Sequence, residues 1–369
     1  MRIALLTYST RPRGGVVHTL ALAEALARAG EDVTVWSLGR GGDARFFRPV
    51  DPAVTVRLVP FPDRDGEGVG PRILRSIAVL GEAYAAAGET YDVVHAQDCI
   101  TANAVGDCIR TVHHLDTFTT PELAACHERA VVAPRVLVCV SAAVAAEVAA
   151  GWGRTATVIP NGVDAARFAA AAGPDGAAGR RVWRERLGDY VLAVGGIEPR
   201  KGTLDLVEAM ALVRRRRPGT RLVVAGGEKL FDYRGYRATV DARAAELGVD
   251  PVVLGPVDHD ALPTLVAGAR AFAFPSTREG FGLAAMEALA AGVPLVARDL
   301  PVLREVFGSA AVFAADPAGF AAALLAPGDP GRRSAGRSLA AGTDWDATAA
   351  AHLDLYRSGL DPPVTCATR

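Results

Sequence analysis

The chain of 369 residues is too long for one compact core and fits two domains of ordinary size. Its 40 basic and 41 acidic residues give a net charge of −1, which provides no electrostatic case for binding nucleic acid or an anionic membrane. The five cysteines are scattered without a CxxC pair or metal-ligand spacing, which favours a reducing compartment over a disulfide framework.

The start of the chain, MRIALLTYSTRPRGG, does not read as a signal peptide, because its apolar run is short, strand-like and followed by a glycine turn. No apolar segment approaches the roughly 18 uninterrupted residues of a transmembrane helix. We therefore expect a soluble cytoplasmic protein, with peripheral membrane contact left open.

Short apolar runs alternate with Ala- and Leu-rich helical patterns through residues 1–168, which we assign to an N-terminal Rossmann-like domain. This alternation predicts a parallel sheet with helices on both faces. In chain order, strands are expected at 3–7, 32–36, 54–59, 92–95, 110–113 and 136–140, and helices at 17–29, 72–87 and 142–149.

Residues 169–188 begin with a small, Gly-rich stretch that lacks periodicity, so a linker is expected there. The alternation then restarts over 189–344, and residues 345–358 form an amphipathic terminal helix expected to cross back to the first domain. Open sheets of this kind bind ligands outside the carboxyl ends of their strands, so we expect the site in a cleft between the domains. In the second domain, strands are expected at 190–194, 221–225, 252–254, 271–274 and 294–297, and helices at 204–215, 236–247, 261–269 and 283–290.

The first strand–helix turn carries Gly14 and Gly15 directly before a helix. Adjacent glycines let backbone amides approach an anion, and the helix N-terminus adds partial positive charge, although an ordinary tight turn would look the same. The dinucleotide fingerprint GxGxxG is missing, and no acidic residue ends the second strand, which counts against a nicotinamide or flavin enzyme.

The strand at 110–113 ends in His113, His114 and, two residues later, Asp116. Successive strand residues face opposite sides, so only one of the two histidines can face the expected cleft. A structural histidine is the alternative. A metal site is not indicated, because no further ligands follow at suitable spacing.

Lys201 and Lys229 are the only lysines among the 40 basic residues. Lys201 follows Arg200 in GGIEPRKGTLDL, between a strand and a helix, where a cation and helix amides would lie beside a bound phosphate. A solvated basic pair on a loop is the plain alternative. Lys229 shares the unusual residue type but not this context.

Two carboxylates flank the start of the helix at 283–290. Glu279 precedes the Gly280–Phe281–Gly282 turn, whose glycine-bounded amides can bind an anion. Glu279 could also merely favour the helix dipole. Glu287 lies inside an otherwise apolar helix with Ala291 at the i+4 position, and such an unpaired carboxylate is costly unless it is exposed or hydrogen-bonded to a ligand.

The stretch EGFGLAAMEALAAGVPLVA resembles the E-x7-E signature of retaining GT-B glycosyltransferases, the group 1 enzymes that include glycogen synthases, sucrose synthases and phosphatidylinositol mannosyltransferases. The resemblance spans nearly the whole chain. Its other marks are the N-terminal GG loop, the helix start around His18, HAQD at 95–98, the TVHH strand end, VIPNGVDAARF at 158–168, EPRKG at 198–202, VVLGPV at 252–257 and WDATAAAHLDLY at 345–356.

The resemblance implies two Rossmann-like domains facing a central cleft, the first binding the acceptor and the second the nucleotide-sugar donor. It also implies that the anomeric configuration is retained, with front-face attack and a leaving phosphate that helps to take the acceptor proton. His113 and Glu279 would be catalytic, near the sugar. The donor would be bound by Gly15, Arg200, Lys201, Gly255, Val257, Gly280, Phe281, Gly282 and Glu287, of which Glu287 would bind the ribose and 254–257 would frame the base.

One departure from the family concerns Gly195-Gly196, where relatives usually carry arginine after the first glycine. One phosphate cation is therefore missing, and Arg200 is its candidate substitute. No cofactor or metal is expected, because cations and helix N-termini can stabilise a leaving diphosphate. The string DHD at 258–260 matches the DxD of metal-dependent glycosyltransferases, but it precedes a helix and is interpreted as a capping turn.

The sequence thus predicts a metal-independent hexosyltransferase that uses a UDP- or GDP-linked sugar. Two alternatives stay open: a nucleotide-sugar-binding regulatory protein without transfer activity, and a nucleotide-sugar epimerase of the same fold, against which the E-x7-E helix argues. The base, the sugar, the acceptor and the oligomeric state cannot be determined from the residues.

Overall fold

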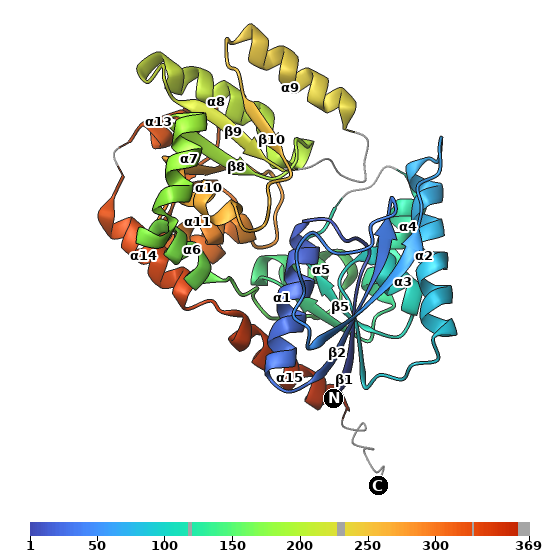
Figure 1. Cartoon of the computed structure of the whole chain (residues 1–369). Coiled ribbons are helices and arrows are strands. Elements are labelled where there is room, and N and C mark those ends of the chain that lie inside the picture. Colours follow the sequence, from blue (N-terminus) through green and yellow to red (C-terminus); the bar gives the residue numbers. More distant parts are fainter. Residues whose placement is uncertain (117–119, 227–232, 327, 361–369) are drawn as a thin grey trace. The chain divides into compact units, whose positions relative to one another are not determined.

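The computed structural model describes residues 1–116, 120–226, 233–326 and 328–360. The chain forms two compact units, each built on its own sheet (Figure 1). Unit 1 comprises Met1–Val140, Val144–Gly162 and Trp345–Arg369, and unit 2 comprises Ser141–Ala143 and Val163–Asp344. Lys229 lies outside the described residues.

Unit 1 contains a seven-stranded sheet in the order β3-β2-β1-β4-β5-β6-β7, with every neighbouring pair parallel. This is the doubly wound order, in which the connections reverse direction between β1 and β4. The elements are β1 (Arg2–Thr7), α1 (Gly14–Arg28), β2 (Asp32–Arg40), β3 (Val54–Phe61), α2 (Val69–Ala86), β4 (Val93–Ala96), α3 (Cys99–Val105), β5 (Ile109–Val112), α4 (Pro121–Val132), β6 (Val136–Cys139), α5 (Ala142–Trp152), β7 (Thr157–Val158) and α15 (Trp345–Leu360).

Unit 2 repeats the same plan with six parallel strands in the order β10-β9-β8-β11-β12-β13. Its connections reverse between β8 and β11. The elements are α6 (Ala165–Ala172), η1 (Pro174–Gly176), α7 (Ala177–Leu187), β8 (Tyr190–Val194), η2 (Pro199–Lys201), α8 (Thr203–Arg216), β9 (Arg221–Ala225), α9 (Arg234–Glu246), β10 (Val252–Gly255), α10 (Leu262–Gly268), β11 (Ala271–Phe274), α11 (Leu283–Ala290), β12 (Leu295–Arg298), α12 (Pro301–Phe307), η3 (Gly308–Ala310), β13 (Ala311–Ala314), α13 (Pro317–Leu325) and α14 (Pro330–Ala341).

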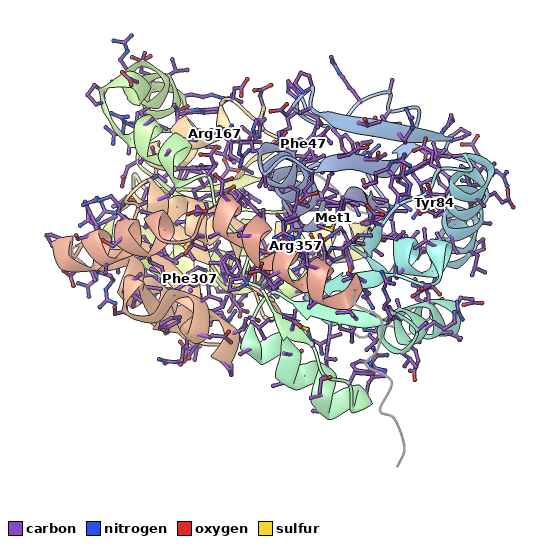
Figure 2. The ribbon with its side chains drawn as sticks, turned by 90° about the horizontal axis from the view of Figure 1, so that it is seen from below. Met1, Phe47, Tyr84, Arg167, Phe307 and Arg357 are labelled. Atoms are coloured by element: carbon purple, nitrogen blue, oxygen red, sulfur yellow. The ribbon has the colours of Figure 1, made fainter. Side chains whose placement is uncertain are left out.

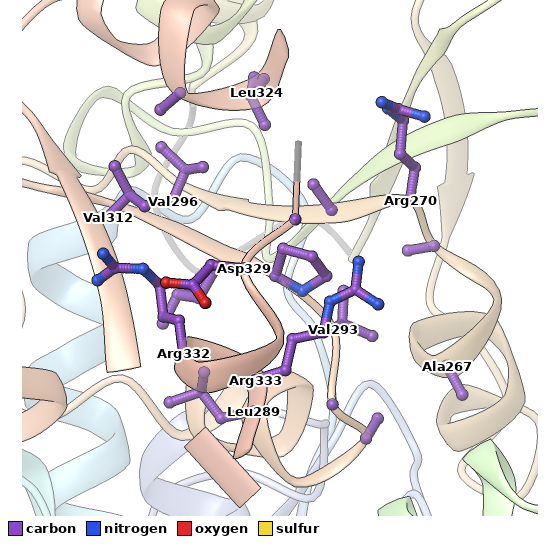
Figure 3. A pocket seen from close by; sticks show the side chains of 18 of the residues that line it. Ala267, Arg270, Leu289, Val293, Val296, Val312, Leu324, Asp329, Arg332 and Arg333 are labelled. Atoms are coloured by element: carbon purple, nitrogen blue, oxygen red, sulfur yellow. The ribbon is translucent and has the colours of Figure 1, made fainter. Parts of the chain in front are cut away.

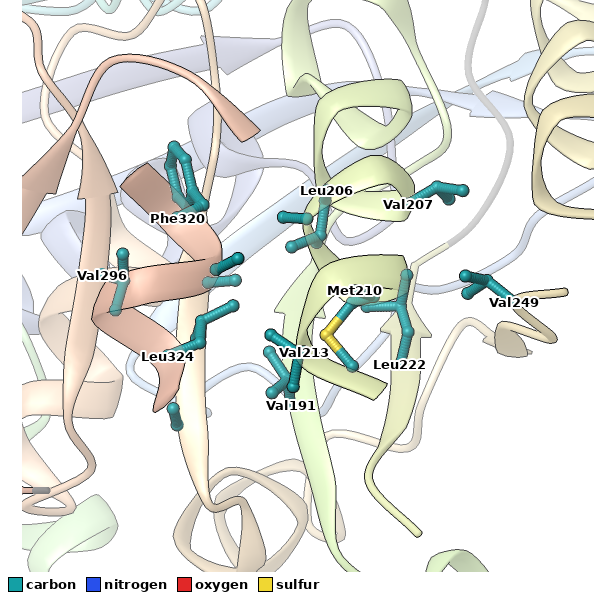
Figure 4. Close-up of a cluster of buried hydrophobic side chains, with 14 of the residues drawn as sticks. Val191, Leu206, Val207, Met210, Val213, Leu222, Val249, Val296, Phe320 and Leu324 are labelled. Atoms are coloured by element: carbon teal, nitrogen blue, oxygen red, sulfur yellow. The ribbon is translucent and has the colours of Figure 1, made fainter. Parts of the chain in front are cut away.

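The core of unit 2 shows why its helices cover the sheet. In α8, Leu206, Met210 and Val213 recur at helical spacing and are at most 1% exposed. They join Phe320 of α13 and Val191 of β8 in one buried cluster (Figure 4). Burial of this apolar stripe fixes α8 and α13 on the sheet and so positions the loop that precedes α8.

Helix α15 packs against α1 in unit 1, although the two helices lie at opposite ends of the sequence (Figure 1). The Tyr356 hydroxyl is within 2.7 Å of His95 Nδ1, and the Thr348 hydroxyl donates to the Pro160 carbonyl at 3.0 Å. Arg357 lies 3.7 Å from the Glu31 carboxylate, near the labelled Met1 (Figure 2). The terminal helix is therefore part of the fold of unit 1.

The prediction of a linker over residues 169–188 is wrong. Those residues lie mostly in α6, η1 and α7, joined by a short turn at Gly173. A Cβ at Gly176 would lie 2.0 Å from the Ala171 carbonyl oxygen, so glycine is needed for close packing there. The glycines mark a tight turn between two helices, and the surrounding alanines are strong helix formers.

Several short elements were not expected from the sequence. Two of the helices carry a clear start signal, an aspartate followed by proline, at Asp316 and Asp329. The Asp316 carboxylate accepts from the Gly319 amide at 2.7 Å, as an N-cap does, and proline fits the first helical position. Among the described helices, none combines the length and apolarity that crossing a bilayer requires.

Candidate functional site

The carboxyl edge of the unit 2 sheet brings together residues far apart in the sequence. The neighbouring strands β8 and β11 end at Val194 and Phe274, where the direction of the connections reverses. This switch point is the usual ligand position of open α/β sheets. The two loops that follow are tied together, because the Thr277 amide donates to the Arg200 carbonyl at 2.7 Å.

Glu279 is the centre of a charge cluster at this edge. Its Oε1 accepts hydrogen bonds from Lys201 Nζ and, at 3.2 Å, from Arg200 Nη1. Arg200 Nε also lies 3.5 Å from the Glu198 carboxylate, and Lys201 Nζ lies 5.3 Å from the Phe274 ring centroid. The structure thus joins three residues singled out in the sequence, with cations held in place by a carboxylate at 11% side-chain exposure.

Glycines allow the backbone to pass closely beside Lys201. Gly202 has φ +64, and a Cβ there would lie 2.1 Å from the Pro275 carbonyl oxygen. Gly195 has φ +142, and its added Cβ would lie 3.3 Å from Lys201 Cε. Both positions therefore require glycine. Gly202 needs it for its positive φ and its close contact with the Pro275 backbone, and Gly195 needs it for its positive φ beside the Lys201 side chain.

The turn 280–282 lies between Glu279 and α11, with Gly280, Phe281 and Gly282 all buried. Gly282 is in the left-handed region at φ +97 and directly precedes the helix. The turn therefore places Glu279 close to the N-terminus of α11, where backbone amides carry partial positive charge.

Glu287 lies in α11, is half-buried and takes no part in the charge cluster of Glu279. Burial raises the pKa of Glu287 to about 7, with Arg167 lowering it and Asp164 raising it. Within the part of the chain that the structure describes, its carboxylate makes no hydrogen bond or ion pair. Such a group can accept a hydrogen bond from a ligand hydroxyl.

Gly255 and Val257 lie at the end of β10, on the far edge of the sheet. Gly255 has φ +70, and its carbonyl accepts from the Gly226 amide at 2.8 Å. In the following DHD string, the Asp258 carboxylate accepts from the Asp260 amide at 2.8 Å rather than from α10. The string forms a turn before the helix, and its aspartate does not cap the helix itself.

In unit 1, the structure places His113 beside Gly15. A Cβ at Gly15 would lie 3.4 Å from His113 Cδ2. His114 diverges from its neighbour, because its Nε2 lies 3.0 Å from the Asp116 carboxylate. Burial, followed by the nearby His114, lowers the pKa of His113 to about 3, so its imidazole is neutral at pH 7.

Three further histidines form a buried group with His113 that the sequence analysis did not assign to the site. His18 contacts His113 and lies 6.2 Å from His352 between ring centroids, and His352 lies 5.6 Å from His95. Each of the three was present in a family mark, at the start of α1, in HAQD and in the terminal helix. Their meeting is a tertiary feature that spacing does not reveal.

A cavity of about 590 Å³ in unit 2 lies at the opposite edge of the sheet, away from these charges (Figure 3). Leu324, Val296 and Val312 contribute apolar walls, while Arg332 and Arg333 come from α14. Arg332 Nη1 donates to the Ser309 and Ala311 carbonyls, both at 2.8 Å. The cavity contains none of the residues predicted for the site. Across the described residues, no group of three or more His, Cys, Asp or Glu side chains is placed to hold a metal ion.

Comparisons with known proteins match both halves of the chain. Residues 183–325 match the family model described as "Glycosyl transferases group 1", and residues 12–167 match "Glycosyltransferase Family 4". The glycogen synthase of Mycobacterium tuberculosis is 30% identical, with 96% of this chain and 94% of the relative aligned. The phosphatidyl-myo-inositol mannosyltransferase of the same species is 29% identical, with 97% of each chain aligned. The D-inositol 3-phosphate glycosyltransferase of Salinispora arenicola is 30% identical, over 96% of this chain and 91% of the relative.

Solved structures show the same fold. HepE from Anabaena, solved in complex with UDP and glucose, aligns with a TM-score of 0.75 at 19% identity, over 97% of this chain and 100% of that one. The sucrose-phosphate synthase of Thermosynechococcus elongatus aligns with a TM-score of 0.76 at 21% identity, over 97% and 98%. Two Rossmann-like units with parallel sheets define the GT-B class of glycosyltransferase folds. The chain belongs to the group 1 glycosyltransferases.

Proposed function

We propose that the protein transfers a hexosyl group from a UDP- or GDP-linked sugar to an acceptor, with retention of anomeric configuration and without a metal ion. Unit 2 binds the donor, and unit 1 carries His113 and binds the acceptor. The observation that carries the proposal is the cluster of Glu279, Lys201 and Arg200 at the switch point of unit 2.

The chemistry requires stabilisation of a departing nucleoside diphosphate. Lys201 and Arg200 would exchange part of their contact with Glu279 for the diphosphate oxygens, and the preorganised cations would stabilise the developing charge. Arg200 would take the place of the arginine that relatives carry after Gly195. Glu279 would then contact the transferred sugar, and Glu287 would accept a hydrogen bond from the donor ribose.

The transfer step exchanges one bond for another at the anomeric carbon. The bond from this carbon to the donor phosphate oxygen breaks, and a bond to the acceptor hydroxyl oxygen forms on the same face. The acceptor proton passes to the leaving phosphate oxygen. Neutral His113 of unit 1 would accept or donate a hydrogen bond to the sugar or the acceptor without adding positive charge.

The proposal is tested by titrating UDP and GDP into wild type and Lys201→Ala, then assaying nucleotide-sugar turnover by wild type and Glu279→Ala. Lys201→Ala is expected to weaken nucleotide binding, and Glu279→Ala to abolish turnover while nucleotide still binds. Glu208→Ala, which removes a surface carboxylate 3.0 Å from Arg243, serves as the control and should leave both unchanged. Unaltered nucleotide affinity in Lys201→Ala would contradict the phosphate assignment.

A second candidate function is nucleotide-sugar binding without transfer, which Gly196 favours because the family cation is missing there. In that case UDP or GDP binds in unit 2, but no nucleotide sugar is turned over with any acceptor. The turnover assay with wild type separates the two functions directly.

A further inference from the structure

The carboxyl ends of β1, β2 and β3 in unit 1 bring two arginines onto one aromatic ring. Tyr8 follows β1, while Arg40 and Phe61 end β2 and β3 and are register partners. Arg40 Cζ lies 5.7 Å from the Tyr8 ring centroid and 5.3 Å from that of Phe61. Arg13, directly before α1, donates to the Tyr8 hydroxyl, and its Cζ lies 5.3 Å from the same ring.

Arg40 is a buried cation without an anionic partner. The residue is 6% exposed, and its guanidinium makes no hydrogen bond or ion pair with the described residues. Burial is the main cause that lowers the pKa of Arg40 to about 10; the nearby Arg72 and Arg13 act in the same direction, and Tyr8 and the exposed Asp63 oppose them. Stacking on two rings recovers part of the desolvation cost, but an unpaired buried charge remains unfavourable until an anion meets it.

The other carboxylates of this region are already engaged. Asp43 lies 3.7 Å from Arg11 and accepts from the Thr10 hydroxyl at 2.7 Å. Glu67 pairs with Arg75 at 2.6 Å. Asp63, the remaining carboxylate near Arg40, is exposed and forms no ion pair with it. Among the described residues, neither Arg13 nor Arg40 therefore forms an ion pair with a carboxylate.

The Asp98 carboxylate is occupied in a different way. It accepts from the Tyr8 amide and from the Thr101 amide, both at 2.9 Å, and so caps α3. Burial raises the pKa of Asp98 to about 6, while the two backbone hydrogen bonds and the nearby Arg110 lower it. Asp98 therefore stabilises the local fold instead of neutralising the two arginines.

The position of this arginine pair favours a ligand. Tyr8 lies beside the switch point between β1 and β4, where open α/β sheets bind ligands. Arg13 directly precedes α1, a helix of 15 residues, and its side chain does not cap the helix. A Cβ at Gly14 would meet no atom within 4 Å, so space is open beside the first amides of that helix. Two guanidinium groups and helix amides together match the charge and geometry of a phosphoryl group.

We propose that Arg40 and Arg13 bind a phosphoryl group of the acceptor substrate, which makes the acceptor a phosphorylated sugar or polyol, free or lipid-linked. A neutral acceptor would leave the buried guanidinium of Arg40 uncompensated. This inference rests on the proposed function, because it specifies the substrate that receives the sugar.

The first test measures the thermal stability of the protein with inorganic phosphate in the presence of excess UDP, which occupies the proposed phosphate contacts of unit 2. Phosphate is expected to raise the Tm of wild type but not of Arg40→Gln or Arg13→Gln, since a ligand stabilises only the state that binds it. Arg57→Gln is the matched control, because Arg57 lies on β3 and pairs with Glu89 at 3.0 Å.

An equal response of Arg40→Gln, Arg13→Gln and wild type to phosphate would overturn the inference. This measurement needs no turnover, so it is independent of whether transfer occurs. Failure of UDP to bind would instead count against the proposed donor function. In that case, the difference in phosphate-induced Tm shift between wild type and the two arginine variants would still show whether Arg40 and Arg13 bind phosphate.

The second test compares acceptors that differ only in phosphate: glucose with glucose 6-phosphate, and myo-inositol with D-inositol 3-phosphate. The phosphorylated member of a pair is expected to be used at least about tenfold better, and Arg40→Gln should raise its KM about tenfold with the KM of the nucleotide sugar unchanged. Equal use of both members, or an equal effect of Arg40→Gln on both, would overturn the inference. Vesicles containing phosphatidylinositol are tested as a third acceptor. Glycosylated product in the lipid fraction would identify a lipid-linked acceptor, whereas product formed only from the soluble phosphates would identify a free one.

Discussion

His18 and His113 meet edge to face in unit 1, with ring centroids 4.7 Å apart and an interplanar angle of 74°. His18 Nδ1 lies 2.8 Å from Asn161 Oδ1, and because that oxygen only accepts, the proton of His18 is on Nδ1. Burial is the main cause that lowers the pKa of both rings. His113 and His352 also lower the pKa of His18, and His114, Arg110 and His352 also lower that of His113. The hydrogen bond to Asn161 thus orients the His18 ring, against which the His113 ring packs edge to face.

Replacing His113 should impair transfer without impairing donor binding. We expect His113→Ala to lower kcat by about 100-fold or more, in the range of a lost positioned proton-transfer or hydrogen-bonding group, while UDP affinity stays unchanged. Steady-state kinetics and UDP titration measure the two quantities. His114→Ala is the matched control, since His114 is the adjacent residue but pairs with Asp116, and its kcat should stay near that of wild type. Equal losses in the two variants would remove the role assigned to His113.

The histidine group should make unit 1 sensitive to acid. Burial lowers the pKa of His352 to about 4, below its value of about 6.5 in the unfolded chain. Between these values the unfolded state binds the proton and the native state does not, so the free energy of unfolding falls as pH decreases from about 6.5 to 4. One such histidine accounts for at most about 1.4 kcal/mol per pH unit. Urea denaturation of wild type and His352→Phe at pH 7, 6 and 5 should show a shallower decline in the variant. Parallel declines would contradict the assignment.

We expect Glu287 to lower the free energy of unfolding and to strengthen nucleotide binding. Its pKa of about 7 is raised above the unfolded value of about 4.5, so its destabilising effect is absent below about pH 4.5, grows between about pH 4.5 and 7 and is complete above about pH 7. Glu287→Gln should therefore raise the free energy of unfolding at pH 8 by about 1–3 kcal/mol, with little change at pH 4.5. The same variant should weaken UDP or GDP binding at pH 8 by about tenfold, because a charge-assisted hydrogen bond is lost. Denaturation and titration at both pH values check this. A stabilised variant that binds nucleotide as wild type does would leave Glu287 without a role in binding.

Gly202 should tolerate substitution far less than another glycine of similar conformation. Gly202→Ala combines φ +64 with a Cβ 2.1 Å from the Pro275 carbonyl oxygen, whereas Gly188→Ala has φ +72 and open space around the added atom. The control should lose about 1 kcal/mol for the left-handed backbone alone, and Gly202→Ala about 3 kcal/mol or more. Chemical denaturation measures both losses. Because Gly202 directly follows Lys201, nucleotide affinity should fall in Gly202→Ala only. Similar losses of stability in the two variants would show that the contact with Pro275 relaxes freely.

The alternation of strands and helices predicted both parallel sheets apart from the edge strands β7 and β13, because most buried parallel strands are short apolar runs bounded by turns. The sequence also located the loop of Lys201 and the helix of Glu287, because glycines precede both and the spacing of apolar residues changes from a strand pattern to a helical one there. Residues 169–188 were misinterpreted as a linker because a segment rich in glycine and alanine has the same composition in a domain linker as in a tight turn between two packed helices. Gly173 and Gly176 belong to such a turn. The distinction depends on a contact with Ala171 that no local pattern contains.

The arginine pair of unit 1 could not have been predicted in the same way. Arg40 ends a strand in a sequence rich in arginine, so its residue type carries no signal. Its burial follows from Tyr8 and Phe61, which contact it from the loop after β1 and from the end of β3. The pairing of Glu279 with Lys201 is similar, because the sequence identified each residue but only the neighbouring positions of β8 and β11 bring them into contact.

The return of α15 to unit 1 affects the order in which the chain folds during synthesis. Domains generally fold as units as they leave the ribosome, the N-terminal one first. Here the last helix of unit 1 is translated after all of Val163–Asp344, so unit 2 has its full set of elements before unit 1 does. Until Tyr356 emerges, His95 lacks the hydroxyl that contacts its Nδ1 in the folded protein. We therefore expect the nascent first half to be a client for chaperones, and a ribosome stalled near residue 344 to display a folded second half beside an incomplete first one.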